Sequence, residues 1–241
     1  MKAGKDYLIF ALDVDSAEAA RAWVMRLRDH VSIFKIGLEL FIRCGPELVE
    51  WVVARSAGGV FLDLKLHDIP ATVQRAMAAV AALKPKFTTV HCGENRAMLD
   101  AAVRASGAVD VLGVTVLTSV SSADLEAAGY PQALAADPGR LVLFRAGLAR
   151  AAGLSGIVCS GHEVGLVRRH FGPDFITVTP GIRPAWEDMS RQDQQRVVTP
   201  AMAVAAGADY IVIGRPIRDA ADPAAAAARI AAEIEEAAGA S

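Results

Sequence analysis

Alternating acidic and basic residues in the segment Phe61–Thr72 carry the strongest chemical signal of the sequence. Asp63 and Lys65 stand two positions apart in a strand-like pattern, so we predict that their side chains lie on one face of a strand. Buried charges are costly unless they are paired, and such a pair can be purely structural. A lysine that is held protonated beside a carboxylate can also act as a general acid. The segment therefore predicts either an internal ion pair or a proton-donating site.

Two further charged residues favour the proton-donating site. Lys35 lies at the end of another apolar run, and Asp68 follows closely after Lys65. Asp68 also precedes Pro70, a residue type common in the first turn of helices, so it could instead cap a helix. If the four charges alternate in space, they form a network that positions one lysine as a protonated donor.

Two combinations of glycine and arginine predict a phosphate site in the C-terminal part of the chain. Gly181 and Arg183 follow one apolar run, and Gly214 and Arg215 follow the last one. Glycine lets backbone N–H groups approach a phosphate closely, and arginine can bind a phosphate with two hydrogen bonds. Ordinary turn glycines beside solvated arginines are the alternative, but the repetition of the combination favours a phosphate site.

Short runs rich in β-branched residues alternate with amphipathic patterns along the chain. We predict strands at Tyr7–Leu12, Val31–Ile36, Gly59–Leu64, Phe87–His91, Val109–Val116, Ser155–Val158, Phe175–Thr179 and Tyr210–Ile213. Helical spacing is clearest at Ala17–Arg28, Ala71–Leu83, Arg96–Ala105 and Glu163–His170. This alternation predicts an α/β fold, a single (β/α)8 TIM barrel that spans residues 1–241 as one domain. A doubly wound open sheet is the alternative architecture.

In a barrel of this kind, the active site lies at the C-terminal ends of the strands. Those predicted ends are densely charged or polar, and they carry Asp13, Lys35, Asp63, Lys65, His91, Thr118, Ser119, Arg183 and Arg215. The polar segment from Gly181 to Pro200 is long for a connection in a compact domain, which predicts a lid or a binding loop.

Composition narrows the class of protein. Of the 241 residues 53% are hydrophobic, and 25 basic residues stand against 27 acidic ones, so neither nucleic acid nor a membrane surface is the expected partner. No stretch resembles a membrane span or a signal peptide. Cys44, Cys92 and Cys159 are few and far apart, which is typical of a reducing, cytoplasmic environment. Without a metal-ligand or dinucleotide motif, we expect no metal and no cofactor.

These segments closely resemble the bacterial orotidine 5′-phosphate decarboxylase family. The segment Asp63–Thr72, which reads D-x-K-x-x-D-I-x-x-T, is the most specific match. Other matching segments follow in order along the chain, at Leu12–Asp13, Lys35–Gly37, Thr115–Ser119, Thr179–Pro184 and Ile213–Arg215. The resemblance implies a cofactor-free carboxy-lyase that converts orotidine 5′-monophosphate to UMP and CO₂, the last step of de novo UMP synthesis.

The resemblance also implies roles for the charged residues. Lys65 would donate a proton to C6 of the pyrimidine as CO₂ leaves. Asp63 would lie against the substrate carboxylate, with Lys35 bracing it. Asp13 and Lys35 would bind the ribose.

Binding of the base and the phosphate is implied in the same way. Thr118 matches the base-binding position, with Ser119 as the nearby alternative. The phosphate would be bound by Arg183, Gln194, Gly214 and Arg215. Gln195 is adjacent to Gln194, and the loop that carries both is somewhat longer than the family pattern, so either glutamine could reach the phosphate.

The family also implies an obligate homodimer with two shared active sites. Asp68 and Thr72 match the aspartate and threonine that the neighbouring subunit supplies. Each site would then take Lys65 from one subunit and Asp68 from the other.

Two other functions are compatible with these motifs. A magnesium-dependent lyase of the same superfamily, acting on ketose phosphates, shares the Asp-x-Lys-x-x-Asp pattern. It has a carboxylate where this chain has Lys35, whose charge would repel Mg²⁺. A non-catalytic, nucleotide-binding dimer is the other alternative, although the intact charged positions disfavour it.

Overall fold

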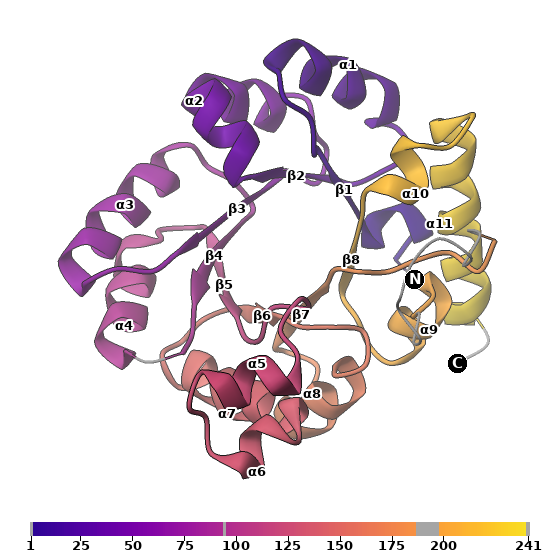
Figure 1. Ribbon diagram of the computed structural model, residues 1–241. Coiled ribbons are helices and arrows are strands. Elements are labelled where there is room, and N and C mark those ends of the chain that lie inside the picture. The colour runs from indigo at the N-terminus through magenta and orange to yellow at the C-terminus, as the bar shows by residue number, and fades with distance from the viewer. Residues whose placement is uncertain (1, 94, 187–197, 240–241) are drawn as a thin grey trace.

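Eight parallel strands close into a barrel in the computed structural model, which describes residues 2–93, 95–186 and 198–239 (Figure 1). Each strand pairs with the next one in the chain, and β8 pairs with β1. The strands are β1 Leu8–Ala11, β2 Ile33–Gly37, β3 Val60–Leu66, β4 Phe87–His91, β5 Asp110–Val114, β6 Gly156–Val158, β7 Ile176–Thr179 and β8 Tyr210–Ile213. The fold is a (β/α)8 TIM barrel, as predicted, and the open sheet is excluded.

Helices form the outer layer of the barrel, as Figure 1 shows. The chain begins with a 3₁₀ helix at Gly4–Tyr7. The α-helices are α1 Ala17–Leu27, α2 Leu38–Val53, α3 Pro70–Ala82, α4 Arg96–Ala105, α5 Ser122–Ala127, α6 Gln132–Ala135, α7 Pro138–Ala151, α8 Val164–Phe171, α9 Pro200–Ala205, α10 Arg215–Arg218 and α11 Pro223–Gly239. No helix within the described part of the chain is long and apolar enough to cross a membrane.

The connection after β5 differs from the simple alternation that the sequence predicts. The strand ends at Val114 rather than at Val116, and the short helices α5 and α6 precede α7. Ser121 starts α5 through a capping box, in which its hydroxyl accepts from the Asp124 N–H and the Asp124 carboxylate accepts from the Ser121 N–H. Helix α5 therefore has a local cause, and α6 lies beside α7 outside the ring of strands (Figure 1).

The core has two layers, because successive side chains of a strand point to opposite faces. One set fills the barrel interior and consists of Ile9, Ala11, Ile33, Phe61, Phe87, Leu112, Val178 and Val212. Their neighbours along the strands, such as Leu8, Phe10 and Leu62, pack outward against the helices. Inside the barrel, the rings of Phe61 and Phe87 meet edge to face with centroids 6.1 Å apart.

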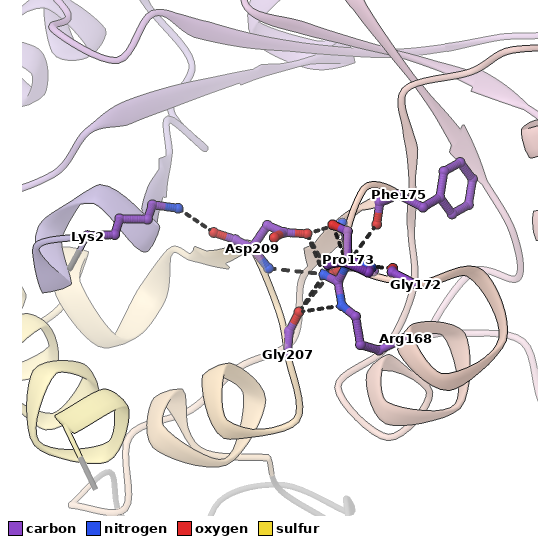
Figure 2. Close-up of polar contacts among 8 residues, drawn as sticks. Lys2, Arg168, Gly172, Pro173, Phe175, Gly207 and Asp209 are labelled. Carbon is purple, nitrogen blue, oxygen red and sulfur yellow. Dashed lines mark hydrogen bonds and ion pairs between the residues drawn. The ribbon is translucent and has the colours of Figure 1, made fainter. Parts of the chain in front are cut away.

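The guanidinium group of Arg168 links α8 to the starts of β7 and β8 at the end opposite the mouth (Figure 2). Arg168 of α8 pairs with the Asp209 carboxylate at 2.6 Å and donates to the carbonyl of Gly207. The same carboxylate accepts from the backbone N–H of Thr177. Arg168 also donates to three further carbonyls, those of Gly172, Pro173 and Phe175. These hydrogen bonds satisfy carbonyls of the segment between α8 and β7 and tie this segment to the starts of both strands.

Lys2 extends this cluster from the N-terminal segment. Its ammonium group donates to the backbone carbonyl of Asp209 at 2.6 Å and lies 3.8 Å from the ring centroid of Tyr210. Burial disfavours the charged form and lowers the pKa of Lys2 to about 8. The folded protein therefore binds fewer protons at this site than the unfolded chain at pH values between about 8 and about 10.5.

We expect Lys2→Met to change how stability depends on pH. Because the pKa of Lys2 is lowered on folding, the cost of burying its charge is fully present below about pH 8 and disappears as the pH rises toward 10.5. The wild-type protein should gain stability relative to Lys2→Met between about pH 7 and about pH 9.5. Urea unfolding of both proteins at the two pH values measures this difference. A difference that stays constant with pH would contradict the assignment.

Candidate active site

The end of β3 departs from a regular strand at the residues that the sequence singles out. The pairing of β3 with β4 shifts register between Leu62 and Leu66, and Lys65 has a φ of 49°, in the left-handed region. In this conformation the Lys65 Nζ atom lies 2.7 Å from Asp63 Oδ2. The predicted pairing of Asp63 with Lys65 is therefore confirmed, although an irregular backbone rather than simple alternation brings the two groups together.

A second ion pair lies on the neighbouring strands. Lys35 in the middle of β2 contacts Asp13, with its Nζ atom 3.2 Å from Asp13 Oδ1. Among the described residues, Lys35 makes no ion pair with Asp63, so the network predicted from sequence is divided into two pairs within one chain. The register of β1 on β2, which places Ala11 beside Lys35, explains why the lysine reaches Asp13.

Asp68 lies outside both ion pairs. Its side chain is exposed, and among the described residues its Oδ1 atom accepts a hydrogen bond only from the next backbone N–H, that of Ile69, at 2.6 Å. Helix α3 begins after Ile69 without a side-chain cap, so Asp68 does not cap the helix. Thr72 lies half-buried in the first turn of α3. Within one chain, neither residue joins the pairs formed by Lys35 and Lys65.

Three adjoining cavities occupy the barrel mouth, and Lys35 lines all of them. The first, here called the central cavity, has a volume of about 260 Å³ and is lined by both ion pairs and by the start of α2. A second cavity, of about 220 Å³, lies toward β7 and β8. A third, of about 200 Å³, is mostly apolar and also contacts Asp63 and Lys65. The charged groups thus stand where a polar space meets an apolar one.

The second cavity contains the predicted phosphate residues. Gly181, Arg183, Gly214 and Arg215 all line it, together with Asp13 and Lys35. Gly181 has a φ of 76°, which favours glycine at this turn. The prediction that the two glycine–arginine combinations meet in space is confirmed, although they are separated in sequence. Gln194 and Gln195 lie outside the described residues.

The third cavity has Thr118 at its rim. Its apolar wall consists of Phe61, Val114, Val116, Leu117, Val158, Cys159, Pro180 and Val212. Ser119, the sequence alternative to Thr118, lines none of the described cavities. A planar, largely apolar group with polar edges would fit such a space.

The cysteines near the site are unsuited to nucleophilic chemistry. Burial raises the pKa of Cys92 to about 12, and its thiol donates to the carbonyl of Val114. Burial likewise raises the pKa of Cys159 well above its usual range. The thiolate forms are therefore scarce at neutral pH, and these residues behave as small buried side chains.

Sequence reasoning missed two residues that support the site. Arg145 of α7 donates to the carbonyl of Thr115 and to the hydroxyl of Tyr130. These bonds anchor the connection that carries Thr118. Thr89 of β4 is fully buried and contacts both Asp63 and Lys65. A threonine inside the predicted strand Phe87–His91 was a signal, because a buried hydroxyl needs a hydrogen-bond partner.

Comparisons with known proteins agree with this arrangement. The model of the orotidine 5′-phosphate decarboxylase / HUMPS family matches residues 6–230. The chain is 52% identical over 240 residues to orotidine 5′-phosphate decarboxylase of Desulfosudis oleivorans, covering 98% of this chain and 96% of that protein. It is 48% identical to the protein of the same name from Thermobifida fusca, with 94% of each covered. The crystal structure of orotidine 5′-phosphate decarboxylase from Lactobacillus acidophilus matches with a TM-score of 0.81 and 35% identity, over 95% of this chain and 99% of that chain.

Proposed function

The chain belongs to the orotidine 5′-phosphate decarboxylase / HUMPS family and converts orotidine 5′-monophosphate to UMP and CO₂ in pyrimidine biosynthesis, and we propose that Lys65 is its proton donor. The observation that carries this proposal is the Asp63–Lys65 ion pair, at 2.7 Å, where the central cavity meets the apolar one. An ammonium group held there can reach a pyrimidine whose ring occupies the apolar cavity.

The chemistry of the reaction explains why a fixed ammonium group is needed. When the bond between C6 and the carboxylate breaks, its electron pair stays on C6 in the plane of the ring, where the π system cannot delocalise it. The Lys65 ammonium stabilises that charge and transfers a proton to C6, which gives UMP. The neutral amine then regains a proton from water. Because the ion pair already holds the ammonium in place, little reorganisation accompanies the step.

The neighbouring pair orients the sugar and the substrate carboxylate. In this proposal Asp63 lies against the carboxylate that leaves as CO₂. Lys35, which pairs with Asp13 rather than with Asp63, lines the same cavities. Asp13 and Lys35 line both the central cavity and the second cavity, which contains the predicted phosphate residues, and from there they hydrogen-bond the ribose hydroxyls. Thr118 contacts the polar edge of the base at the rim of the apolar cavity.

The phosphate binds at the far end of the mouth in this proposal. Arg183 and Arg215 supply charge and hydrogen bonds, and Gly214 leaves room for close approach. We include Gln194 as a further contact. Binding energy from this remote group can be used to order the ribose and the base at the reacting carbon.

We further propose a homodimer in which Asp68 and Thr72 complete the partner's site. Asp68 is exposed, and it makes no ion pair with any described residue of its own chain. Exposed apolar side chains also occur on α2 and next to Asp68, with Leu38 48%, Ile42 78% and Ile69 65% accessible. Leu38 and Ile42 belong to α2 and Ile69 directly precedes α3, and these two helices are neighbours around the barrel (Figure 1). A second copy that covers them would bury this surface and bring an acidic group to Lys65.

We propose a reducing, cytoplasmic location, which the free thiols of Cys44, Cys92 and Cys159 support.

The alternative functions receive no support. A magnesium-dependent lyase is disfavoured because the ammonium of Lys35 lies against Asp13, where a bound cation would be repelled. A non-catalytic dimer receives none either, since the full-length relatives are named as decarboxylases.

Lys65→Ala should abolish turnover while leaving product binding nearly intact. We expect kcat to fall by at least about 10⁴-fold, since both proton donation and charge stabilisation are lost. The loss of absorbance of orotidine 5′-monophosphate, followed in the presence of EDTA, measures kcat, and titration with UMP measures product binding. Wild-type turnover in this variant would exclude Lys65 as the donor, and wild-type activity lost with EDTA would revive the magnesium-dependent alternative.

Arg215→Ala should weaken transition-state binding through the phosphate. Loss of a charged contact is worth about 2–3 kcal/mol, so kcat/KM should fall roughly 30- to 150-fold. Arg104→Ala, on the exposed surface of α4, removes the same charge elsewhere and should leave kcat/KM unchanged. An equal effect of the two substitutions would mean that general electrostatics, rather than a phosphate contact, is responsible.

Hybrid dimers test whether Asp68 acts across the interface. Lys65→Ala and Asp68→Ala should each be inactive alone. In a hybrid of the two, one site regains Lys65 and Asp68 from different chains. An equal mixture, dissociated and reassembled, should therefore recover about a quarter of wild-type activity, because half of its dimers are hybrids with one intact site. If Asp68 acts within its own chain, no activity returns.

A further inference from the structure

One buried hydroxyl joins both members of the Asp63–Lys65 pair. Thr89 of β4 has no exposed surface, and its Oγ1 atom donates to Asp63 Oδ1 at 2.9 Å. The same oxygen accepts the backbone N–H of Lys65, also at 2.9 Å. Building on the proposed role of Lys65, we propose that Thr89 is a positioning residue that fixes the proton donor and its carboxylate partner.

The hydrogen bonds of the carboxylate show how this works. A threonine hydroxyl has one hydrogen to donate, and here it goes to Asp63 Oδ1. The other oxygen, Oδ2, contacts Lys65 Nζ at 2.7 Å. With each oxygen engaged by a different partner, the carboxylate cannot rotate without breaking a contact. Thr89 therefore sets the direction from which Asp63 holds the ammonium.

The second bond acts on the backbone of Lys65. A left-handed φ, here 49°, is unfavourable for a residue other than glycine and persists only where the surroundings hold it. The register of β3 on β4 is broken between Leu62 and Leu66, so the regular ladder does not hold Lys65. Its N–H bonds to the hydroxyl of Thr89 instead. The threonine thus stabilises the irregular backbone that turns the lysine toward the cavity.

Thr89 acts only through other residues, since it lines none of the described cavities of the mouth. Its neighbour Thr88 offers a matched comparison. Thr88 is equally buried on the same strand, but its hydroxyl donates to the carbonyl of Leu62, at 2.9 Å, and contacts neither charged group. Removing the Thr88 hydroxyl takes one hydrogen bond from the Leu62 carbonyl, whereas only the loss of the Thr89 hydroxyl disturbs the ion pair.

The test compares Thr89→Val, Thr89→Ser and Thr88→Val in the decarboxylation of orotidine 5′-monophosphate. Thr89→Val keeps the shape and removes the hydroxyl, so we expect kcat to fall about 10- to 100-fold, within the range of lost positioning. KM and the Kd of UMP should change by less than about threefold, because the phosphate and ribose contacts remain. Thr89→Ser keeps the hydroxyl and should restore kcat to within about threefold of wild type. Thr88→Val should lower Tm without lowering kcat.

Several outcomes would overturn the inference. These are a wild-type kcat in Thr89→Val, an equal loss in Thr89→Ser, or a matching loss of kcat in Thr88→Val. If Thr89→Val does not fold, Thr89→Ser and Thr89→Ala answer the same question, because both lack the methyl group and only Ser keeps the hydroxyl. Equal kcat values in that pair would then overturn it.

The failure of this inference can be told apart from the failure of the proposed function. Full activity of Lys65→Ala would overturn the role of Lys65, and with it the role of Thr89. An inactive Lys65→Ala beside a fully active Thr89→Val would overturn the role of Thr89 alone.

Discussion

The active site depends on one ion pair, in which the Asp63 carboxylate and the Lys65 ammonium group lie 2.7 Å apart beside the apolar cavity. The pair is largely withdrawn from water, with 13% of the Asp63 side chain and 29% of the Lys65 side chain exposed. Partial burial strengthens the attraction between the charges, but their lost hydration must be offset by fixed geometry and further hydrogen bonds. The irregular end of β3 and the hydroxyl of Thr89 provide that geometry.

The barrel separates the groups that hold it together from the groups that react. At the end opposite the mouth, Arg168 and Asp209 join α8 to β7 and β8 through backbone carbonyls and N–H groups. At the mouth, the charged groups contact cavities instead. This division is typical of TIM barrels, whose strand C-termini carry chemistry while the opposite face contributes stability. Substitutions at the two ends therefore act mainly on different quantities, the free energy of unfolding and the rate.

In a single chain, the side chains of Asp68 and Ile69, just before α3, are exposed to solvent. Within the part of the chain that the structure describes, the carboxylate of Asp68 hydrogen-bonds only to the adjacent backbone, and Ile69 beside it is 65% exposed. Exposed apolar surface marks an interaction site, and both features acquire a function if a second copy covers them. The homodimer that we propose would thus explain the position of Asp68 and the apolar surface around it by one physical cause.

The sequence by itself determined the fold and the residue types of the site. Alternating runs predicted all eight strands to within a few residues, and the spacing of Asp63 and Lys65 predicted their pairing, because both signals are local. Tertiary structure decided which distant groups meet. Lys35 pairs with Asp13, 22 positions away, and Thr89 reaches Asp63 across 26 positions, through the register of neighbouring strands and a break in one of them. Local spacing determines which face a side chain occupies, whereas its partners depend on how the closed barrel brings separate strands into register.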